Sequence, residues 1–277
     1  MDSIVSKFYQ ENLETKSSAQ RNYQFNSQDY LIYEVIRTSE GVALFLEDHL
    51  ARMRGALSVL TLEKRFHESE VHSCLELLMD TNRNQTGNIK LLCKPFKKQL
   101  FYAAYYIPHV YPTDIMYRRG VKLVTYEIER PDPKIKQVLV SERIQSALES
   151  SRIRESAYEI LLIDQSGCIT EGSKSNIFFI RDGRMYSPPE NKILSGITRK
   201  HILQIAGKNN IDVNFHEILL SGINQYDSAF ICGTSPKIMP VKRINRCNFK
   251  VRNPITDLLL KEYNSEIQQY IDTRIRD

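Results

Sequence analysis

Residues 157–180, AYEILLIDQSGCITEGSKSNIFFI, are the stretch of the chain that decides the fold. The runs at 158–163 and 176–180 are rich in isoleucine, leucine and phenylalanine, which favours buried strands. Residues 164–167, DQSG, are typical of a hairpin turn, so a second strand should follow them directly. Glu171 then lies at the exit of that second strand, where its carboxylate could face a cleft. A solvated surface carboxylate is the alternative interpretation.

A second informative stretch is LSGITR, residues 194–199, which comes just before a helix predicted from near Thr198. Gly196 lets the backbone approach a ligand closely, and the first turn of a helix offers unpaired N–H groups at the positive end of its dipole. Gly233 and Thr234 follow another predicted strand and form a similar turn. Together the two turns predict a seat for one phosphate. An ordinary helix N-cap is the alternative interpretation of the Gly-Ile-Thr sequence.

Strand and helix periodicities alternate along the rest of the chain, so the fold class is predicted to be mixed α/β (α+β). Further strands are predicted at residues 30–37, 42–46, 89–93, 100–107, 121–126 and 229–232, with 89–93 and 100–107 paired as a hairpin. Helices are predicted at residues 49–57 with Asp48 as N-cap, at 71–78 and 141–150, and from near 198 and 255. Periodicity is lost between Pro112 and Gly120. The chain should therefore divide into a smaller N-terminal domain, 1–118, and a larger C-terminal domain, 119–277.

Composition excludes several classes of protein. The 277 residues are 42% hydrophobic, which is the balance of a globular chain rather than a disordered one. The net charge of +5 is mild and spread out, so it indicates no nucleic-acid surface, although an anion site is compatible with it. Five cysteines without a CxxC spacing indicate neither a disulfide framework nor a metal site. The chain has no long apolar run and opens without a signal-like segment, so a cytoplasmic location is expected.

Three motifs in order, EGSKSN at 171–176, LSGITR at 194–199 and GTSP at 233–236, resemble the class IV (fold type IV) pyridoxal-phosphate aminotransferases. That family includes branched-chain and D-amino-acid aminotransferases and aminodeoxychorismate lyase. Near the N-terminus, the family's His-x-x-Arg marker resembles residues 49–52, and its strand tyrosine resembles Tyr33 in a Tyr-Glu-Val context. The resemblance covers most of the chain.

The resemblance implies two α/β domains with pyridoxal 5′-phosphate in the cleft between them. It implies that Arg52 pairs with the cofactor phosphate, although a surface helix charge is the alternative for this residue. The remaining implied cofactor-binding residues are Leu194, packed on the pyridine ring, and Gly196, Ile197, Thr198, Gly233 and Thr234 at the phosphate. Tyr33 and Lys174 are implied to contact the substrate.

Glu171 acquires a chemical role from this resemblance. A carboxylate bound to the pyridine nitrogen keeps that nitrogen protonated, so the ring can accept electrons from the substrate α-carbon. The reaction also needs a lysine that forms the resting Schiff base and shuttles the α-proton. Lys134 and Lys136 are the candidates, and alternation places both on one face of an extended segment. Family spacing to the strand at residues 158–163 places the lysine nearer Val138, so Lys136, the preferred candidate, fits only if the turn expected at residues 150–154 carries an insertion of about two residues.

The implied activity is transfer of an amino group from an amino acid to a 2-oxo acid. The alternatives are an aminodeoxychorismate lyase, which eliminates pyruvate, and an inactive binding protein on the same scaffold. A homodimer is expected by resemblance. Tyr102, Tyr105 and Tyr106 would supply aromatic surface on both faces of one strand, which suits a half-wet interface, although core packing explains them equally simply. Side-chain preference and the choice between L and D substrates do not follow from the sequence.

Overall fold

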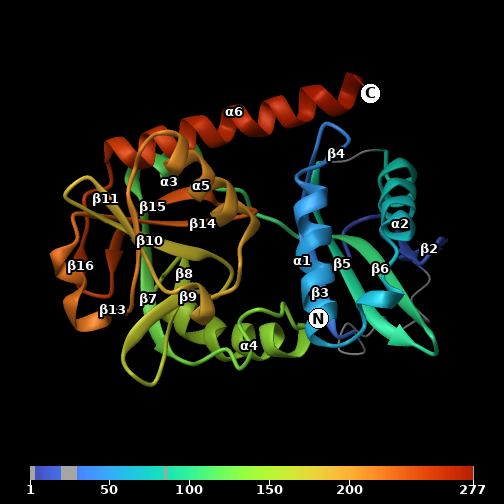
Figure 1. Ribbon diagram of the computed structural model, residues 1–277, viewed down its shortest axis with the longest axis horizontal. Helices are drawn as coiled ribbons and strands as arrows, with labels where there is room; N and C mark the ends of the chain where they lie inside the picture. The colour runs from blue at the N-terminus through green and yellow to red at the C-terminus, as the bar shows by residue number, and fades with distance from the viewer. Residues whose placement is uncertain (1–3, 20–29, 84–85, 277) are drawn as a thin grey trace. The chain divides into compact units, whose positions relative to one another are not determined.

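The structure is a computed structural model that describes residues 4–19, 30–83 and 86–276 (Figure 1). Its contacts group the chain into two compact units. The first unit contains Met1–Val110, Ile135–Leu139 and Ile267–Asp277, and the second unit contains Tyr111–Lys134 and Val140–Glu266. A compact unit is defined by contacts and a domain by its ability to fold alone. The predicted domain bounds, 1–118 and 119–277, therefore stay a prediction.

The first unit is built on one antiparallel sheet. Among its described residues the strand order is β2-β1-β6-β5-β3-β4. The strands are β1 Phe8–Glu11, β2 Glu14–Ser17, β3 Ile32–Ser39, β4 Val42–Ala43, β5 Gly87–Phe96 and β6 Gln99–Ile107. Helices α1 Leu46–Val59 and α2 Glu68–Thr81, with the short 3-10 turn η2 Glu63–Arg65 between them, pack on one face of this sheet. Leu50, Met53 and Leu57 of α1 are buried there, as their helical spacing predicts.

The hairpin predicted from residues 89–93 and 100–107 is confirmed as β5 and β6, which pair from Asn88 with Ile107 to Phe96 with Gln99. Tyr102 and Tyr106 lie on the helix-covered face, and Tyr105 lies on the other, so the predicted alternation is correct. All three are at most 1% exposed within one chain. Their use as interface surface is therefore wrong, and core packing accounts for them.

The start of α1 differs from the prediction. The helix begins at Leu46, so residues 44–46 are not strand, and Asp48 lies in the first turn rather than at the N-cap. The N-cap is Phe45, which adopts a left-handed conformation with φ of 52° and makes no side-chain cap. The Leu46 N–H instead donates to the Tyr270 hydroxyl at 3.1 Å. A residue distant in sequence thus satisfies one of the unpaired N–H groups that a local cap normally serves.

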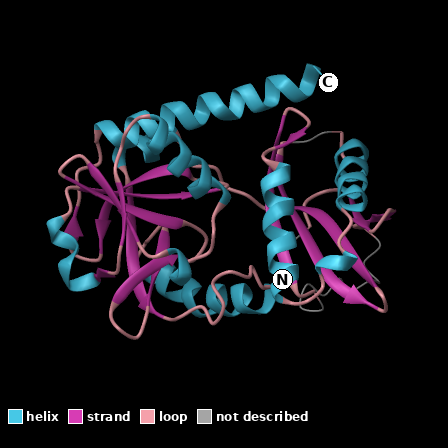
Figure 2. Cartoon of the chain, viewed as in Figure 1, coloured by secondary structure: helices cyan, strands magenta, loops and turns pink. Residues whose placement is uncertain are grey.

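The second unit is built on a larger mixed sheet, drawn in Figure 2 as the bigger group of strands. In the described part of this unit the order is β12-β11-β10-β14-β15-β7-β8-β9-β13, and β16 pairs with β15. The strands are β7 Val121–Glu127, β8 Glu159–Ile163, β9 Cys168–Gly172, β10 Asn176–Arg181, β11 Arg184–Ser187, β12 Val213–Phe215, β13 Ile218–Leu219, β14 Ser228–Gly233, β15 Lys237–Ile244 and β16 Cys247–Asn248. The hairpin predicted around residues 164–167 is confirmed, because β8 and β9 pair antiparallel.

The helices of the remaining chain are α3 Asp114–Arg119, α4 Val138–Arg154, α5 Ile197–Lys208 and α6 Pro254–Arg276, with 3-10 turns η3 Glu190–Lys192 and η4 Leu220–Gln225. Ile144 of α4 packs with Val124 and Ile160, so α4 covers one face of the sheet. The turn expected at residues 150–154 is wrong, because α4 continues to Arg154. The short helix α3 was missed; Thr113 caps it through its side chain. No helix in the described part of the chain is long and apolar enough to cross a membrane.

Candidate active site

The first unit holds a buried polar cluster between β3 and α1. Glu34 lies on β3, and its Oε2 is 2.8 Å from Nδ1 of His49, one turn before Arg52 on α1. Arg52 donates from Nε to Glu34 Oε1 at 2.8 Å and from Nη2 to Oε2. The Glu34 and Arg52 side chains are 2% and 11% exposed. The family marker residues His49 and Arg52 therefore meet at one carboxylate.

The electrostatics of this cluster depend on the arginine. Burial alone would raise the pKa of Glu34, but the Arg52 charge and the hydrogen bonds from His49 and Arg52 hold it far below its ordinary value. Burial lowers the pKa of His49, even though Glu34 opposes this shift. A neutral His49 donates its Nδ1 hydrogen to Glu34, a tautomer assigned from its partner. Glu34 thus fixes one edge of the Arg52 guanidinium.

The first unit also holds Lys136, in an extended segment just before α4. Its carbonyl accepts a hydrogen bond from the Tyr33 N–H at 3.0 Å, and Gln137 bridges to Ile32 on the same strand. The Lys136 Nζ lies 4.9 Å from the centre of the Tyr33 ring. Lys90 of β5, only 5% exposed, places its own Nζ 5.0 Å from the same ring. Two ammonium groups therefore lie near one tyrosine.

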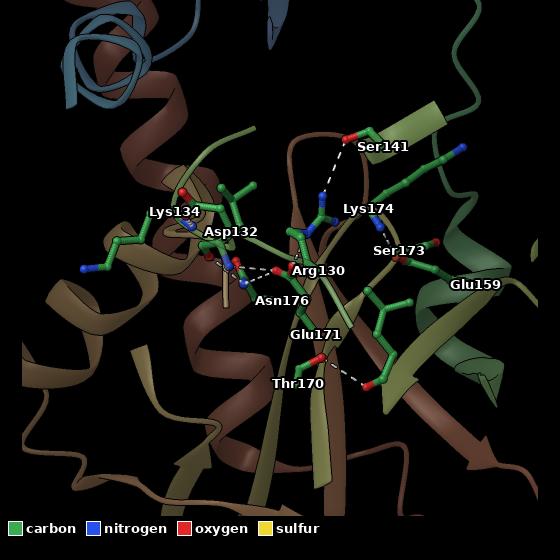
Figure 3. Close-up of polar contacts among 12 residues, drawn as sticks. Arg130, Asp132, Lys134, Ser141, Glu159, Thr170, Glu171, Ser173, Lys174 and Asn176 are labelled. Carbon is green, nitrogen blue, oxygen red and sulfur yellow. Dashed lines mark hydrogen bonds and ion pairs between the residues drawn. The ribbon is translucent and has the colours of Figure 1, made fainter. Parts of the chain in front are cut away.

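Lys134 lies in the second unit, in the exposed turn before Ile135. Its N–H donates to the Asp132 carboxylate at 3.2 Å. Its side chain points away from Arg130 and Glu171 (Figure 3). The two candidate lysines, which the sequence did not separate, therefore occupy different surroundings.

The centre of the site in the second unit is the Glu171 carboxylate at the end of β9. It accepts from Nε of Arg130 at 2.8 Å through Oε1, and from the Leu194 N–H at 3.0 Å through Oε2. The Asn176 amide is 3.5 Å from Oε2 and donates to the Leu194 carbonyl at 2.9 Å. Figure 3 shows Arg130, Glu171 and Asn176 pointing toward one another. Glu171 is 3% exposed, so the solvated-surface interpretation is wrong.

The start of α5 adjoins this carboxylate. Gly196 is the N-cap and provides no side-chain cap, and a Cβ at this position would lie 2.0 Å from Oδ1 of Asn176. Glycine is therefore required at residue 196 for this close approach to the Asn176 side chain. Thr198 is buried in the first turn, with its hydroxyl 3.3 Å from that of Tyr263. The N–H groups of this turn have no partner from their own cap residue, which suits an anion.

The second predicted turn lies at the same edge of the sheet. Asn176 of β10 pairs with Cys232 of β14, so Gly233 and Thr234 follow directly beside it. Lys174 precedes Asn176, and its N–H donates to buried Glu159 of β8 at 2.6 Å. Glu159 also accepts from Ser175 at 2.9 Å. Burial raises the pKa of Glu159 above its ordinary value despite these donors.

The predicted site residues thus form two groups. The first unit holds Tyr33, Arg52 and Lys136, and the second unit holds Lys134, Glu171, Lys174, Leu194, Gly196, Ile197, Thr198, Gly233 and Thr234. Arg130, Asn176 and Glu159 were missed as site residues. Asn176 and Glu159 lie within the stretch that decides the fold, but Arg130 lies in an aperiodic loop.

Comparison with known proteins gives a consistent result. The Amino-transferase class IV family matches residues 31–244. A D-alanine aminotransferase of Bacillus licheniformis is 29% identical over 240 residues, which cover 81% of each chain. A branched-chain-amino-acid aminotransferase of Pseudomonas aeruginosa is 24% identical, with 84% of this chain and 82% of that protein covered. The fold matches that of a branched-chain amino acid aminotransferase of Thermobaculum terrenum in its PLP form, with a TM-score of 0.79, 20% identity, and coverage of 96% and 95%.

Proposed function

The chain belongs to the Amino-transferase class IV family, and from this premise we propose how its residues perform the reaction of that family. It is an aminotransferase that uses pyridoxal 5′-phosphate and moves an amino group from an amino acid to a 2-oxo acid. The single observation that carries the residue assignment is the buried Glu171 carboxylate, bound by the Leu194 N–H just before an uncapped helix N-terminus. The carboxylate binds Leu194, and the anion seat begins two residues later at Gly196. These two groups match the ring nitrogen and the phosphate of this cofactor.

The second-unit residues fit the ring and the phosphate. Glu171 would hold the pyridine nitrogen through a charged hydrogen bond, in a buried site where an ion pair is stronger than at the surface. Leu194 would pack on the ring. The Ile197 N–H and the hydroxyls of Thr198 and Thr234 would bind the phosphate, with Gly196 and Gly233 allowing close backbone approach.

The first-unit residues supply cations. Arg52, which Glu34 orients, would bind the phosphate with its guanidinium. Lys136 would hold the cofactor covalently, and two observations favour it over Lys134: it is partly buried, and its backbone is bonded to Tyr33. Tyr33 and Lys174 are the proposed substrate contacts.

Bound pyridoxal phosphate supplies an electron sink for the bond broken at the substrate α-carbon. Glu171 keeps a proton on the ring nitrogen, which makes that sink effective. The Lys136 Nζ removes and returns the α-proton, a task that requires its neutral form during turnover.

No observation favours the lyase or the inactive binding protein, and the relatives described above are aminotransferases by name. We propose that the protein is a cytoplasmic homodimer, on the strength of the family resemblance. Light scattering tests the assembly: a mass near 32.2 kDa at micromolar concentration, with full activity, would contradict the dimer.

Cofactor capture tests the residue assignment. The purified protein should absorb in the visible with bound pyridoxal phosphate, and borohydride should fix the cofactor to the peptide that contains Lys136. Lys136→Ala should abolish this label while Lys134→Ala, the matched control, keeps it. A label on Lys134 would reverse the assignment, and a colourless parent that binds no cofactor would contradict the function itself.

Amino donors then test the reaction. D-alanine and the branched-chain L-amino acids should be offered separately with a 2-oxo acid acceptor, because relatives named for both kinds of substrate match this chain. Glu171→Gln should keep bound cofactor but lose most turnover, since the phosphate seat remains while the ring-nitrogen partner becomes neutral. Near-parent turnover in that variant would remove Glu171 from the mechanism.

A further inference from the structure

Arg130 and Glu171 form an ion pair that the proposed function does not use. Arg130 follows β7 in the loop that leads toward α4, and its Nε lies 2.8 Å from Oε1 of Glu171. The two side chains are 7% and 4% exposed, so solvent screens the pair little. Nη1 of Arg130 is also 3.5 Å from the hydroxyl of Ser141 on α4, which helps to fix the guanidinium (Figure 3).

Burial favours the protonated form of a carboxyl group, and an adjacent positive charge opposes this effect. Glu159, in the same unit, accepts from a backbone N–H and from serine hydroxyls and is also nearly inaccessible. Its pKa is nevertheless raised, because burial outweighs those donors and the charge of Lys174. Glu171 has comparable neutral donors in Leu194 and Asn176. The guanidinium of Arg130 is what distinguishes its surroundings from those of Glu159.

We propose that Arg130 is a positioning residue that keeps Glu171 ionised and oriented, so that a carboxylate rather than a carboxylic acid meets the pyridine nitrogen. This inference rests on the proposed function, which makes Glu171 the partner of the cofactor ring. Arg130 itself touches neither the cofactor nor the substrate in this account. It acts through the protonation state and direction of one side chain.

Several other charged groups on the elements around Glu171 have polar partners of their own. They are Glu159 with Lys174 and Ser175, Lys192 with Asp164 and Glu217, Arg199 with Glu190, and Asp132 with the Lys134 N–H. Asn176 and Leu194, which contact the carboxylate directly, are neutral. A change at Arg130 therefore alters the charge beside Glu171 more directly than a change at any of these groups.

The test compares Arg130→Met with Glu171→Gln in cofactor-loaded protein, from pH 6 to 9.5. Without the guanidinium, burial favours the protonated form of Glu171, so Arg130→Met should show the absorption spectrum of Glu171→Gln at pH 7 and turn over at least about tenfold more slowly than the parent. Raising the pH should return the Arg130→Met spectrum and turnover toward those of the parent. Glu171→Gln has no proton to lose there, so it should not recover.

Two further variants complete the comparison. Arg130→Lys keeps the charge and should retain the parent spectrum at pH 7. Arg152→Met, which breaks the exposed pair between Arg152 and Glu149 on α4, is the matched control and should follow the parent at every pH. If Arg130→Met is poorly folded, Arg130→Gln takes its place, and the recovery with pH remains the readout.

Three outcomes would overturn the inference. Arg130→Met could match the parent at pH 7, or it could match Glu171→Gln at every pH, which would leave Arg130 a purely structural role. A parent that fails to bind pyridoxal phosphate would overturn the proposed function as well. In the first two outcomes the parent still binds cofactor and turns over, so the two failures are distinguishable.

Discussion

Glu34 in the first unit and Glu159 in the second are both buried glutamates, yet their pKa values shift in opposite directions from the ordinary value. Glu34 is bound by a guanidinium and an imidazole, and its pKa lies far below the ordinary value. Glu159 is bound by a backbone N–H and serine hydroxyls, and its pKa is raised. Burial favours the neutral acid in both, and the charge of Lys174 near Glu159 does not offset it, so the guanidinium bonded directly to Glu34 makes the difference. Glu171 resembles Glu34 in having an arginine, which is why its anionic form suits the proposed role.

Among the changes that test this comparison, removal of the Glu34 charge should have the largest effect on stability. Glu34→Gln removes the buried carboxylate that binds Arg52, whose side chain is 11% exposed. Breaking one partner of such a buried pair typically costs about 3–5 kcal/mol, so the free energy of unfolding should fall by that order at pH 7. Urea unfolding of the cofactor-free protein measures it.

The matched control for Glu34 is an exposed pair. Glu149→Gln removes the partner of Arg152 at the surface of α4, where both side chains are well exposed. Its cost should be below about 1 kcal/mol. Equal costs for the two variants would show that the Glu34 cluster contributes no more than a surface ion pair.

Loss of a phosphate donor from the first unit should weaken cofactor binding more than loss of a donor from the second unit. Arg52→Ala removes a charged donor and should weaken binding of pyridoxal phosphate by about 1.5–3 kcal/mol, whereas Thr234→Ala removes a neutral hydroxyl and should cost about 0.5–1.5 kcal/mol. Equilibrium titration of apo protein gives both values. Pyridoxal without its phosphate is the control ligand, because neither variant should change its affinity much. Arg52 is not the surface charge that the sequence left as its alternative, because its side chain is 11% exposed and bonded to Glu34, and unchanged affinity in Arg52→Ala would leave it only that structural role.

The sequence predicted those parts of the fold and site that depend on local pattern. Glu171 at the exit of β9 and Gly196 before α5 follow from a hairpin turn and a helix start, both of which are read within a few residues. The start of α1 could not be predicted this way, because Tyr270, 224 residues away, binds its first N–H. Arg130 was missed for the same reason: it meets Glu171 41 residues away, from a loop without periodicity. Long-range pairing, unlike periodicity, leaves no mark on a single sequence.

The contrast between Glu159 and Glu34 also predicts opposite signs for the dependence of stability on pH. A carboxyl whose folded pKa is raised stabilises the fold below its ordinary value of 4.5, and this contribution is lost as pH rises through the folded pKa. Glu34 has the opposite sign, because its contribution is present above 4.5 and is lost as pH falls below that value.

Glu159→Gln cannot ionise, and it keeps an oxygen for the Lys174 N–H. The parent should therefore lose stability relative to Glu159→Gln as pH rises from 4.5, by about 1.4 kcal/mol for each unit by which the pKa is raised. Urea unfolding of both proteins at intervals from pH 4.5 to 8 measures the difference. A difference that stays constant, or that moves in favour of the parent with rising pH, would mean that the neutral donors around Glu159 suffice to hold a buried anion. In that case Glu171 would not need Arg130 either, so this measurement bears on the proposed role of Arg130 without a change to Arg130 or Glu171.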